Sequence, residues 1–269
     1  MNRPAPTMTL NVDLTNPGQF LACCGLLELA SRVDANAVGW FDGGQFLLCG
    51  GGADLLQQFI RCPVNPLGAE TAEAEQQETE DGKKENDDKS PPVLFDAPFH
   101  FVLDWWTNKS ATDAGFKTWA GGQSVAGFIN GMFGHLSQIL SAADGALFRA
   151  VPIRKPKPFY FDARLARLTS LDFGFSAEDF AAAFSPAVEV LAFIGLQRFG
   201  PRMIVHRECY GFSVWEHALP VTIAAAVAHG LMPALEYARF CFPLVVRTGG
   251  KYKAFGPALP ERIPYVRNA

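Results

Sequence analysis

The sequence predicts an α+β protein in which small mixed or antiparallel sheets pack against buried apolar helices. Residues 9–14 alternate between apolar and polar side chains, the pattern of a strand with one buried face. Residues 16–32 are apolar on nearly every side, so the helix that they predict has to be buried on more than one side. Asp42-Gly43-Gly44 separates two short apolar runs, and this arrangement is a hairpin signal.

The N-terminal elements follow one another closely. Asn16 is a suitable N-cap, Pro17 fits the first helical position, and Gln19 completes a capping-box pattern. The order of the first 62 residues is β-α-β-β-α, which is common in RNA-binding proteins and is shared with many other folds. The predicted bounds are a strand at 9–14, a helix at 16–32, strands at 38–41 and 45–49, and a helix at 53–60 after three consecutive glycines.

A charged insertion follows at about residues 66–92. It is rich in Glu, Gln, Lys and Asp and has almost no large apolar residue, so we predict that it is disordered and forms no domain of its own. A strand is predicted next, at 93–105. Pro98 within it favours a position at a sheet edge or a bulge, because proline has no backbone N–H to donate.

A helix is predicted from about Ser124. Gly127, Gly131 and Gly134 recur in it at roughly helical spacing and predict close packing against another helix. The remaining predicted elements are a basic extended linker at 154–158, strands at 159–164 and 170–175, a helix at 177–199 with a kink or break at Pro186, a hairpin at 203–215 with Tyr210-Gly211 near its turn, a helix at 220–229 and strands at 235–247.

The charges divide the chain into an acidic segment and a basic half. Residues 70–90 carry a net charge of −6 while the whole chain carries −4, so the remainder carries +2. Residues 149–269 hold 15 Lys and Arg against nine Asp and Glu. We therefore predict an N-terminal α+β region at 1–148, which contains the insertion, and a basic C-terminal α+β region at 149–269, or one continuous domain. A basic face suits phosphate backbones, although scattered basic residues are also typical of an ordinary solvated surface.

The composition is that of a cytoplasmic protein with apolar surface to bury. Charged residues make up 19% of the chain, below the usual share of about 25%, and there are 23 Phe residues. This fits either a large core or a subunit that buries faces against partners. The six cysteines form no CxxC pair or Cys/His cluster, which predicts free thiols in a reducing compartment and no structural zinc. We expect neither a signal peptide nor a membrane span.

Signatures of common enzymes are absent from the sequence. There is no GxxxxGK[ST], GxSxG or HExxH pattern, so we expect no cofactor and no catalytic residue. An alternative is a metal-dependent nuclease built on scattered aspartates, although capping or surface roles are the more ordinary interpretation of each. The aspartates considered are Asp96, Asp104, Asp113, Asp162 and Asp172.

The most unusual segment is 104–123, which combines tryptophans, lysines and amides in a glycine-containing loop. Trp105, Trp106 and Trp119 are more ordinary as core residues than as stacking platforms. Amide side chains can read a base edge and lysines can hold phosphate. The candidate DNA-binding residues are Asn108, Lys109, Lys117 and Gln123 in this loop, Arg154, Lys155 and Lys157 in the basic linker, and Lys251 and Lys253 beside a flexible glycine pair.

Two segments resemble a known family. The opening strand followed by NPGQFLACCGLLELA at 16–30, and the LDWW and KTWAGGQ patterns at 103–106 and 117–123, are similar to the large-subunit-like protein of the type I-G CRISPR effector complex, formerly called type I-U. The size of the chain and its charged insertion are similar too. Neither pattern is a catalytic signature, and the family supplies no motif that fixes DNA-reading residues on this sequence.

The resemblance implies a specific role. Such a subunit sits at the foot of a crRNA-guided surveillance complex, reads the short protospacer-adjacent motif in duplex DNA, aids R-loop formation and recruits the helicase-nuclease, without cleaving DNA itself. Its expected partners are the crRNA-bound Cascade subunits, target double-stranded DNA and the CRISPR helicase-nuclease. The alternatives are the metal-dependent nuclease and a purely structural assembly subunit that does not contact nucleic acid.

Overall fold

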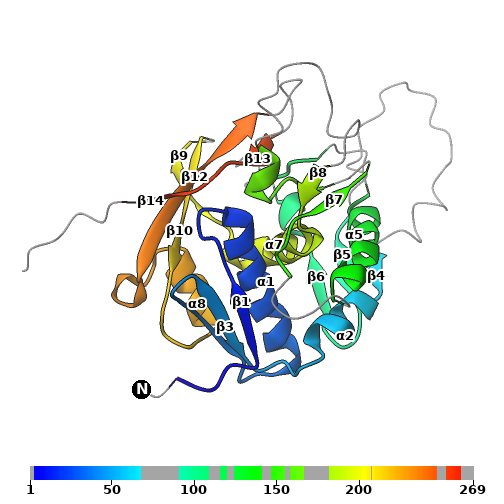
Figure 1. Ribbon diagram of the computed structural model, residues 1–269, viewed down its shortest axis with the longest axis horizontal. Helices are drawn as coiled ribbons and strands as arrows, with labels where there is room; N and C mark the ends of the chain where they lie inside the picture. Colours follow the sequence, from blue (N-terminus) through cyan, green and yellow to red (C-terminus); the bar gives the residue numbers. More distant parts are fainter. Residues whose placement is uncertain are drawn as a thin grey trace, which may run out of the picture.

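The computed structural model of the chain has an α+β architecture, which confirms the predicted fold class (Figure 1). It describes residues 3–67, 91–108, 116–119, 124–140, 147–154, 158–166, 182–206, 208–246 and 253–261. The helices are α1 (Pro17–Val33), α2 (Leu55–Arg61), α5 (Val125–Leu140), α7 (Pro186–Phe199) and α8 (Val221–Ala228), with short 3-10 helices η1 (Trp105–Thr107), η2 (Ala163–Leu165) and η3 (Pro233–Leu235). No helix among these residues is both long enough and apolar enough to cross a membrane.

The strands form small antiparallel sheets around α1 and α7. The first sheet has the order β1-β3-β2-β11, from β1 (Met8–Asn11), β3 (Gln45–Cys49), β2 (Val38–Asp42) and β11 (Leu219–Pro220). The second has the order β13-β12-β10-β9, from β13 (Lys253–Phe255), β12 (Ala238–Val246), β10 (Cys209–Val214) and β9 (Arg202–Val205), and β14 (Leu259–Pro260) also pairs with β12. Two further sheets are β4-β5-β6, from Val64–Pro66, Val93–Phe95 and Phe101–Leu103, and β7-β8, from Val151–Ile153 and Ala182–Phe184.

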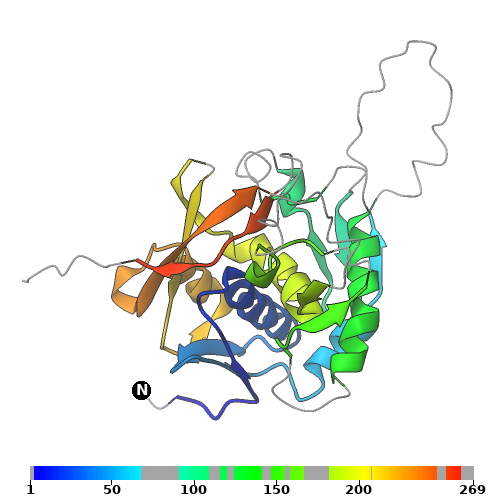
Figure 2. The same cartoon turned by 45° about the horizontal axis from the view of Figure 1, so that its top comes forward.

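The N-terminal helix α1 is enclosed on all sides. Every residue from Pro17 to Ala30 is buried, as the sequence predicts for a helix that is apolar all round. Figure 2 shows α1 with the yellow and orange strands on one side and the green helix α5 on the other. Strand β11, which comes from the C-terminal half, joins the first sheet beside β2. The two predicted regions therefore share a sheet, while the boundary at residues 148 and 149 stays a prediction.

The start of α1 agrees with the prediction in its cap and differs in its capping box. Asn16 is the N-cap, and its side chain accepts a hydrogen bond from the Gly18 amide at 3.1 Å. The side chain of Gln19 does not return to the Asn16 amide. It accepts instead from the Asp13 amide at 2.9 Å, because the chain turns between Asp13 and Asn16 and brings the earlier residue within reach.

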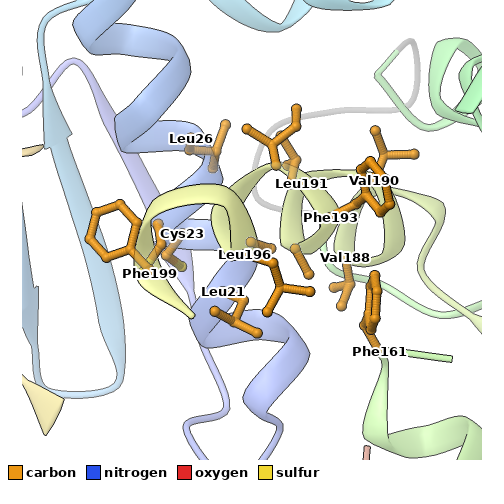
Figure 3. Close-up of a cluster of buried hydrophobic side chains, with 14 of the residues drawn as sticks. Leu21, Cys23, Leu26, Phe161, Val188, Val190, Leu191, Phe193, Leu196 and Phe199 are labelled. Carbon is orange, nitrogen blue, oxygen red and sulfur yellow. The ribbon is translucent and has the colours of Figure 1, made fainter. Parts of the chain in front are cut away.

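Helices α1 and α7 cross in direct backbone contact. A Cβ atom added at Gly25 would come closer than 3.0 Å to the carbonyl oxygen of Leu191, and one added at Gly195 would come equally close to that of Leu21. Figure 3 shows the apolar side chains of both helices, among them Leu26, interleaved around this crossing. Glycine is required at both positions because any side chain would force the two helices apart.

The glycines of α5 do not pack closely against another helix, so the prediction of a close helix–helix contact at these positions was wrong. Gly127, Gly131 and Gly134 are all exposed, and a Cβ atom at Gly131 or Gly134 would have no neighbour within 4 Å. The apolar stripe of α5, with Ile129 and Leu136 at its centre, faces the core and turns the glycines toward the outside. Helical spacing predicts which residues share a face but not whether that face is covered.

Several predicted elements are divided differently in the structure. The strand at 93–105 is a hairpin, β5 and β6, followed by η1, and Pro98 lies in the turn, where the Phe99 and His100 amides both donate to the Asp96 carbonyl. Residues 159–164 form no strand. They run into η2, whose first turn is capped by the Asp162 side chain. The strand predicted at 170–175 lies outside the described residues.

Of the helix predicted at 177–199, residues 177–181 lie outside the described residues, and helix α7 begins at Pro186. Ser185 is its N-cap, with its hydroxyl accepting from the Val188 amide at 3.2 Å, and residues 182–184 form β8. Proline occupies the first helical turn, where its missing N–H is not needed. The hairpin at 203–215 turns before Cys209, and Gly211 lies within β10, where the Ile204 side chain closely approaches its backbone. A glycine inside a strand therefore marks close approach here and not a turn.

Most of the other predicted elements are present, whereas residues 155–157 of the predicted basic linker lie outside the described residues. The first five occur in the predicted order, with Gly43 and Gly44 at positive φ in the β2–β3 turn, as a primed hairpin turn requires. Helix α8 and strand β12 lie at the predicted places. All six cysteines are free thiols, as predicted, and Cys23, Cys24 and Cys62 are buried.

Most of the predicted insertion lies outside the described residues, but its flanking residues lie side by side. Strands β4 and β5 are antiparallel neighbours, and the Leu67 amide donates to the Pro92 carbonyl at 2.8 Å. Deleting residues 70–90 should therefore leave the melting temperature and helix content close to wild type, because a short turn can join the ends. Circular dichroism and thermal melting check this. An insoluble variant, or one with reduced helix content, would show that the segment is part of the folded structure.

Candidate nucleic-acid interface

The tryptophans of the 104–123 segment belong to the core, in agreement with the interpretation favoured for them. Trp105, Trp106 and Trp119 are buried and meet one another edge to face, with ring centroids 5.7–6.2 Å apart. All three also contact the ring of Phe193 on α7. These indole rings have no free face for a nucleic-acid base. Their role in the segment is to fix the backbone of the residues between them.

A glutamine on α7 holds the start of this segment in place. Gln197 accepts hydrogen bonds from the Asp104 and Trp105 amides, each at 3.1 Å, and its own amide donates to the Asp104 carboxylate at 2.9 Å. The Trp105 indole donates to the Phe193 carbonyl at 3.0 Å. Together these bonds fix η1, and Asn108 follows directly after it with an exposed side chain. In the sequence Gln197 is one of three polar residues of α7, with Glu189 and Arg198, and nothing local marks it as the partner of residue 104.

The second part of the segment is anchored by two buried neighbours of Lys117. Phe116 packs against Tyr210 and Phe255, with ring centroids 4.6 and 6.0 Å apart. The hydroxyl of Thr118 donates to the Phe159 carbonyl. Lys117 is thus held, half-buried, between two fixed residues.

One contact connects two of the predicted groups of cations. Phe255, the partner of Phe116, ends strand β13, which begins at Lys253. Lys117 and Lys253 therefore lie on segments that pack against each other, although they are 136 positions apart in the sequence. Arg154 follows β7 and is exposed. Lys109, Gln123, Lys155, Lys157 and Lys251 lie outside the described residues.

Part of the basic excess of the C-terminal half is neutralised by ion pairs. Arginines there face carboxylates at short distances, which leaves them less available to phosphate. The described pairs are Arg164 with Asp162, Arg198 with Glu28, Arg202 with Glu261, and Arg239 with Glu236. None of these arginines is among the candidate DNA-binding residues.

A buried polar cluster fixes the Phe159–Asp162 stretch beneath the tryptophans. The Asn16 side chain donates to the Asp162 carboxylate at 2.8 Å and accepts from the Ala163 amide at 3.1 Å. Asp162 also accepts from the Ser185 amide and from the Arg164 guanidinium. The cap of α1, the turn at η2 and the cap of α7 are thereby joined in one hydrogen-bond network.

Glu189 belongs to this cluster and is wholly buried. One of its carboxyl oxygens accepts from the Phe161 amide at 3.1 Å and the Asp162 amide at 2.7 Å, whereas the other has no hydrogen-bond partner. Burial raises the pKa of Glu189 to about 8, and the nearby Asp162 charge adds to the effect, against the lowering by the backbone hydrogen bonds. We therefore expect Glu189 to hold its proton in the folded protein at neutral pH.

The aspartates considered for a nuclease site have structural partners where they are described. Asp162 is engaged in the buried cluster, Asp104 accepts from Gln197, and Asp96 accepts from Asn65 at 3.1 Å. Asp113 and Asp172 lie outside the described residues. Within the part of the chain that the structure describes, no three His, Cys, Asp or Glu side chains are grouped as metal ligands would be.

Comparison of the chain with protein-family models, with curated proteins and with solved structures finds no match.

Proposed function

We propose that this chain is a non-catalytic subunit of a crRNA-guided type I CRISPR surveillance complex. In that role it contacts duplex DNA at the protospacer-adjacent motif, aids R-loop formation and recruits the helicase-nuclease. Guide pairing supplies most of the sequence specificity in such complexes, and the protein reads a short duplex motif together with backbone shape. The proposed partners are the crRNA-bound Cascade subunits, the target duplex and the helicase-nuclease.

One observation carries the proposal beyond the resemblance in sequence. Two of the stretches that resemble the family, 16–30 and 103–106, are distant in the chain but pack on the same helix, α7. Their apolar residues therefore form one core, and this core supports the polar end of the second segment at Asn108. Such a core could hold Asn108 in a fixed position for binding, which supports the proposal.

The candidate residues divide into two groups with different expected roles. Asn108 and Gln123 carry the paired donor and acceptor needed to read a base edge, while Lys117 and Lys253 supply charge for phosphate. Removing an amide should cost about 1–3 kcal/mol on the correct motif and little on an altered one. Removing a lysine should weaken binding to all duplexes about equally and lower the salt slope by about one.

The test is a titration of the assembled complex against duplexes with correct and altered flanking motifs at two salt concentrations. Asn108→Ala and Lys117→Ala are the principal variants. Asn130→Ala on the outer face of α5 and Arg61→Ala on α2 are matched controls, because both side chains are exposed on other elements. If Asn108→Ala, Gln123→Ala and Lys109→Ala all bind both duplexes like wild type, the loop is a packing element. Cleavage of labelled DNA by the complex with divalent metal alone would contradict the non-catalytic role.

A further inference from the structure

Two cysteines from different strands meet on one face of the second sheet. Cys209 belongs to β10 and Cys241 belongs to β12, and these strands are antiparallel neighbours. The register places Cys209 opposite Pro243 and Cys241 opposite Gly211. The two cysteines are therefore diagonal neighbours on the same face of the ladder, where side chains of adjacent strands can interact.

The face that carries the two cysteines is turned away from the core. Phe212 and Phe242, which alternate with them along β10 and β12, are buried on the opposite face. Cys209 and Cys241 are only half-buried, in contrast to the fully buried Cys23. The Cys209 thiol also hydrogen-bonds to the Cys241 side chain, so the two sulfur atoms lie close to each other. Both thiols can therefore be reached from solution at the same time.

The diagonal spacing suits a bridging ion better than a disulfide. Diagonal neighbours on an antiparallel pair have Cα atoms about 7–8 Å apart and Cβ atoms somewhat closer. A disulfide requires Cβ atoms about 3.5–4.5 Å apart. One ion between the sulfur atoms replaces a single S–S bond of about 2.05 Å by two metal–sulfur bonds of about 2.3 Å. The bridge becomes about 2.5 Å longer and then matches the diagonal spacing.

The number and type of the ligands select the ion. Structural zinc takes four ligands, but in the described ranges no group of three His, Cys, Asp or Glu side chains could hold a metal. The carboxylate that acts on Cys209, that of Glu261, is ion-paired with Arg202 at 3.4 Å, which leaves sulfur as the donor. Soft thiolates select Cu(I), and this ion is stable with two sulfur ligands in a line.

We propose that Cys209 and Cys241 form a two-thiolate site that binds one Cu(I) ion on the exposed face of the second sheet. Binding replaces two S–H bonds by two S–Cu bonds and releases both protons to solvent, and copper and sulfur keep their oxidation states. This inference goes beyond the proposed function, because neither cysteine belongs to the segments that resemble the family or to the candidate DNA-binding residues. It is tested on the isolated chain, so the failure of either proposal leaves the other unaffected.

The probe is Cu(I) itself, added to the reduced chain under argon in competition with a coloured Cu(I) chelator. We expect the chain to remove one equivalent of Cu(I) from the chelator, as measured by the loss of its absorbance. Cys209→Ser and Cys241→Ser should each lower the affinity for Cu(I) by about 100-fold or more, because a single thiolate cannot chelate. Cys49→Ser is the matched control, since Cys49 is also a half-buried free thiol but lies on β3, and it should bind like wild type.

A second measurement examines the copper in the wild-type chain, so the test does not depend on the folding of the variants. X-ray absorption of the loaded chain should show two sulfur ligands, and sedimentation should show a monomer. The proposal is overturned if the wild-type chain does not compete for Cu(I), or if Cys49→Ser weakens binding as much as Cys209→Ser. It is also overturned if loading produces a dimer, because the copper would then join thiolates of two chains.

Discussion

Replacing Gly195 by alanine is expected to destabilise the fold by about 3 kcal/mol, as overpacking at a rigid contact does. The added Cβ atom would lie closer than 3.0 Å to the Leu21 carbonyl oxygen, and the backbone of a buried helix cannot move aside as a flexible side chain can. The two helices would have to separate, and the side chains that interleave at their crossing in Figure 3 would lose contact together. Urea denaturation at neutral pH measures the change in the free energy of unfolding.

The matched control for this prediction lies on α5. Gly131 is also inside a helix, but nothing lies within 4 Å of a Cβ atom added there. Gly131→Ala should therefore stabilise the protein by about 0.5–1 kcal/mol, because alanine loses less conformational entropy in a helix. If Gly195→Ala lowers the free energy of unfolding and Gly131→Ala raises it, the close backbone contact between α1 and α7 stabilises the fold. Equal effects would mean that the helices can separate without loss, and that the close contact does not support the fold.

These two glycines also show how far the sequence could predict the fold. Local signals sufficed for the cap at Asn16 and the turn at Gly43 and Gly44, because those conformations depend on the residues in the turn themselves. The role of a helical glycine depends on what faces it. Gly25 and Gly195 are 170 positions apart, and no local pattern distinguishes them from Gly131.

The start of a helix within an apolar run is hard to predict for a similar reason, because the residues on both sides of the boundary are alike. The sequence at 177–199 is apolar throughout, so hydrophobic pattern alone favoured one long helix with an interruption at Pro186. The pair Ser185-Pro186 is in fact a start signal, with the hydroxyl as N-cap and proline in the first turn. This information was present in the sequence. Giving capping chemistry precedence over hydrophobic continuity would have placed the helix correctly.

The exposure of Asn108 could be predicted from the sequence, whereas the residues that hold its segment in place could not. Asn108 follows two tryptophans and is exposed, as expected of a polar residue beyond a buried pair. Its position depends on Gln197, which contacts Asp104 across 93 positions. The link between Asn16 and Asp162 spans 146 positions. Hydrogen bonds between residues this far apart in the sequence depend on how the helices pack, and only the folded structure reveals them.

The charge state of Glu189 should control how the stability of the protein changes with pH. An ordinary glutamate in the unfolded chain has a pKa of 4.5, whereas burial raises the pKa of Glu189 to about 8 in the folded protein. Between these values the folded state holds a proton that the unfolded state has released. Stability is therefore fully present below pH 4.5 and falls as the pH rises toward 8. Each unit of pKa corresponds to about 1.4 kcal/mol, so the loss should reach a few kcal/mol.

Glu189→Gln removes this titration while keeping the side-chain oxygen that accepts from the Phe161 and Asp162 amides. The variant should resemble wild type at pH 5 and exceed it in stability at pH 8, as measured by urea denaturation at both values. Glu28→Gln provides the contrasting control. Burial alone would raise the pKa of Glu28, but hydrogen bonds from Arg198 and Arg32 outweigh it and lower the pKa.

The ionised form of Glu28 is therefore the stabilising one, and its contribution is lost as the pH falls through its lowered pKa. Glu28→Gln should destabilise the protein at pH 8, where Glu189→Gln stabilises it. The two carboxyl groups lie on the paired helices α1 and α7. One series of denaturation experiments therefore compares two substitutions in the same core that should change stability in opposite directions. A difference between Glu189→Gln and wild type that stays constant from pH 5 to pH 8 would show that Glu189 is ionised in the folded protein, and that the buried cluster accommodates two negative charges.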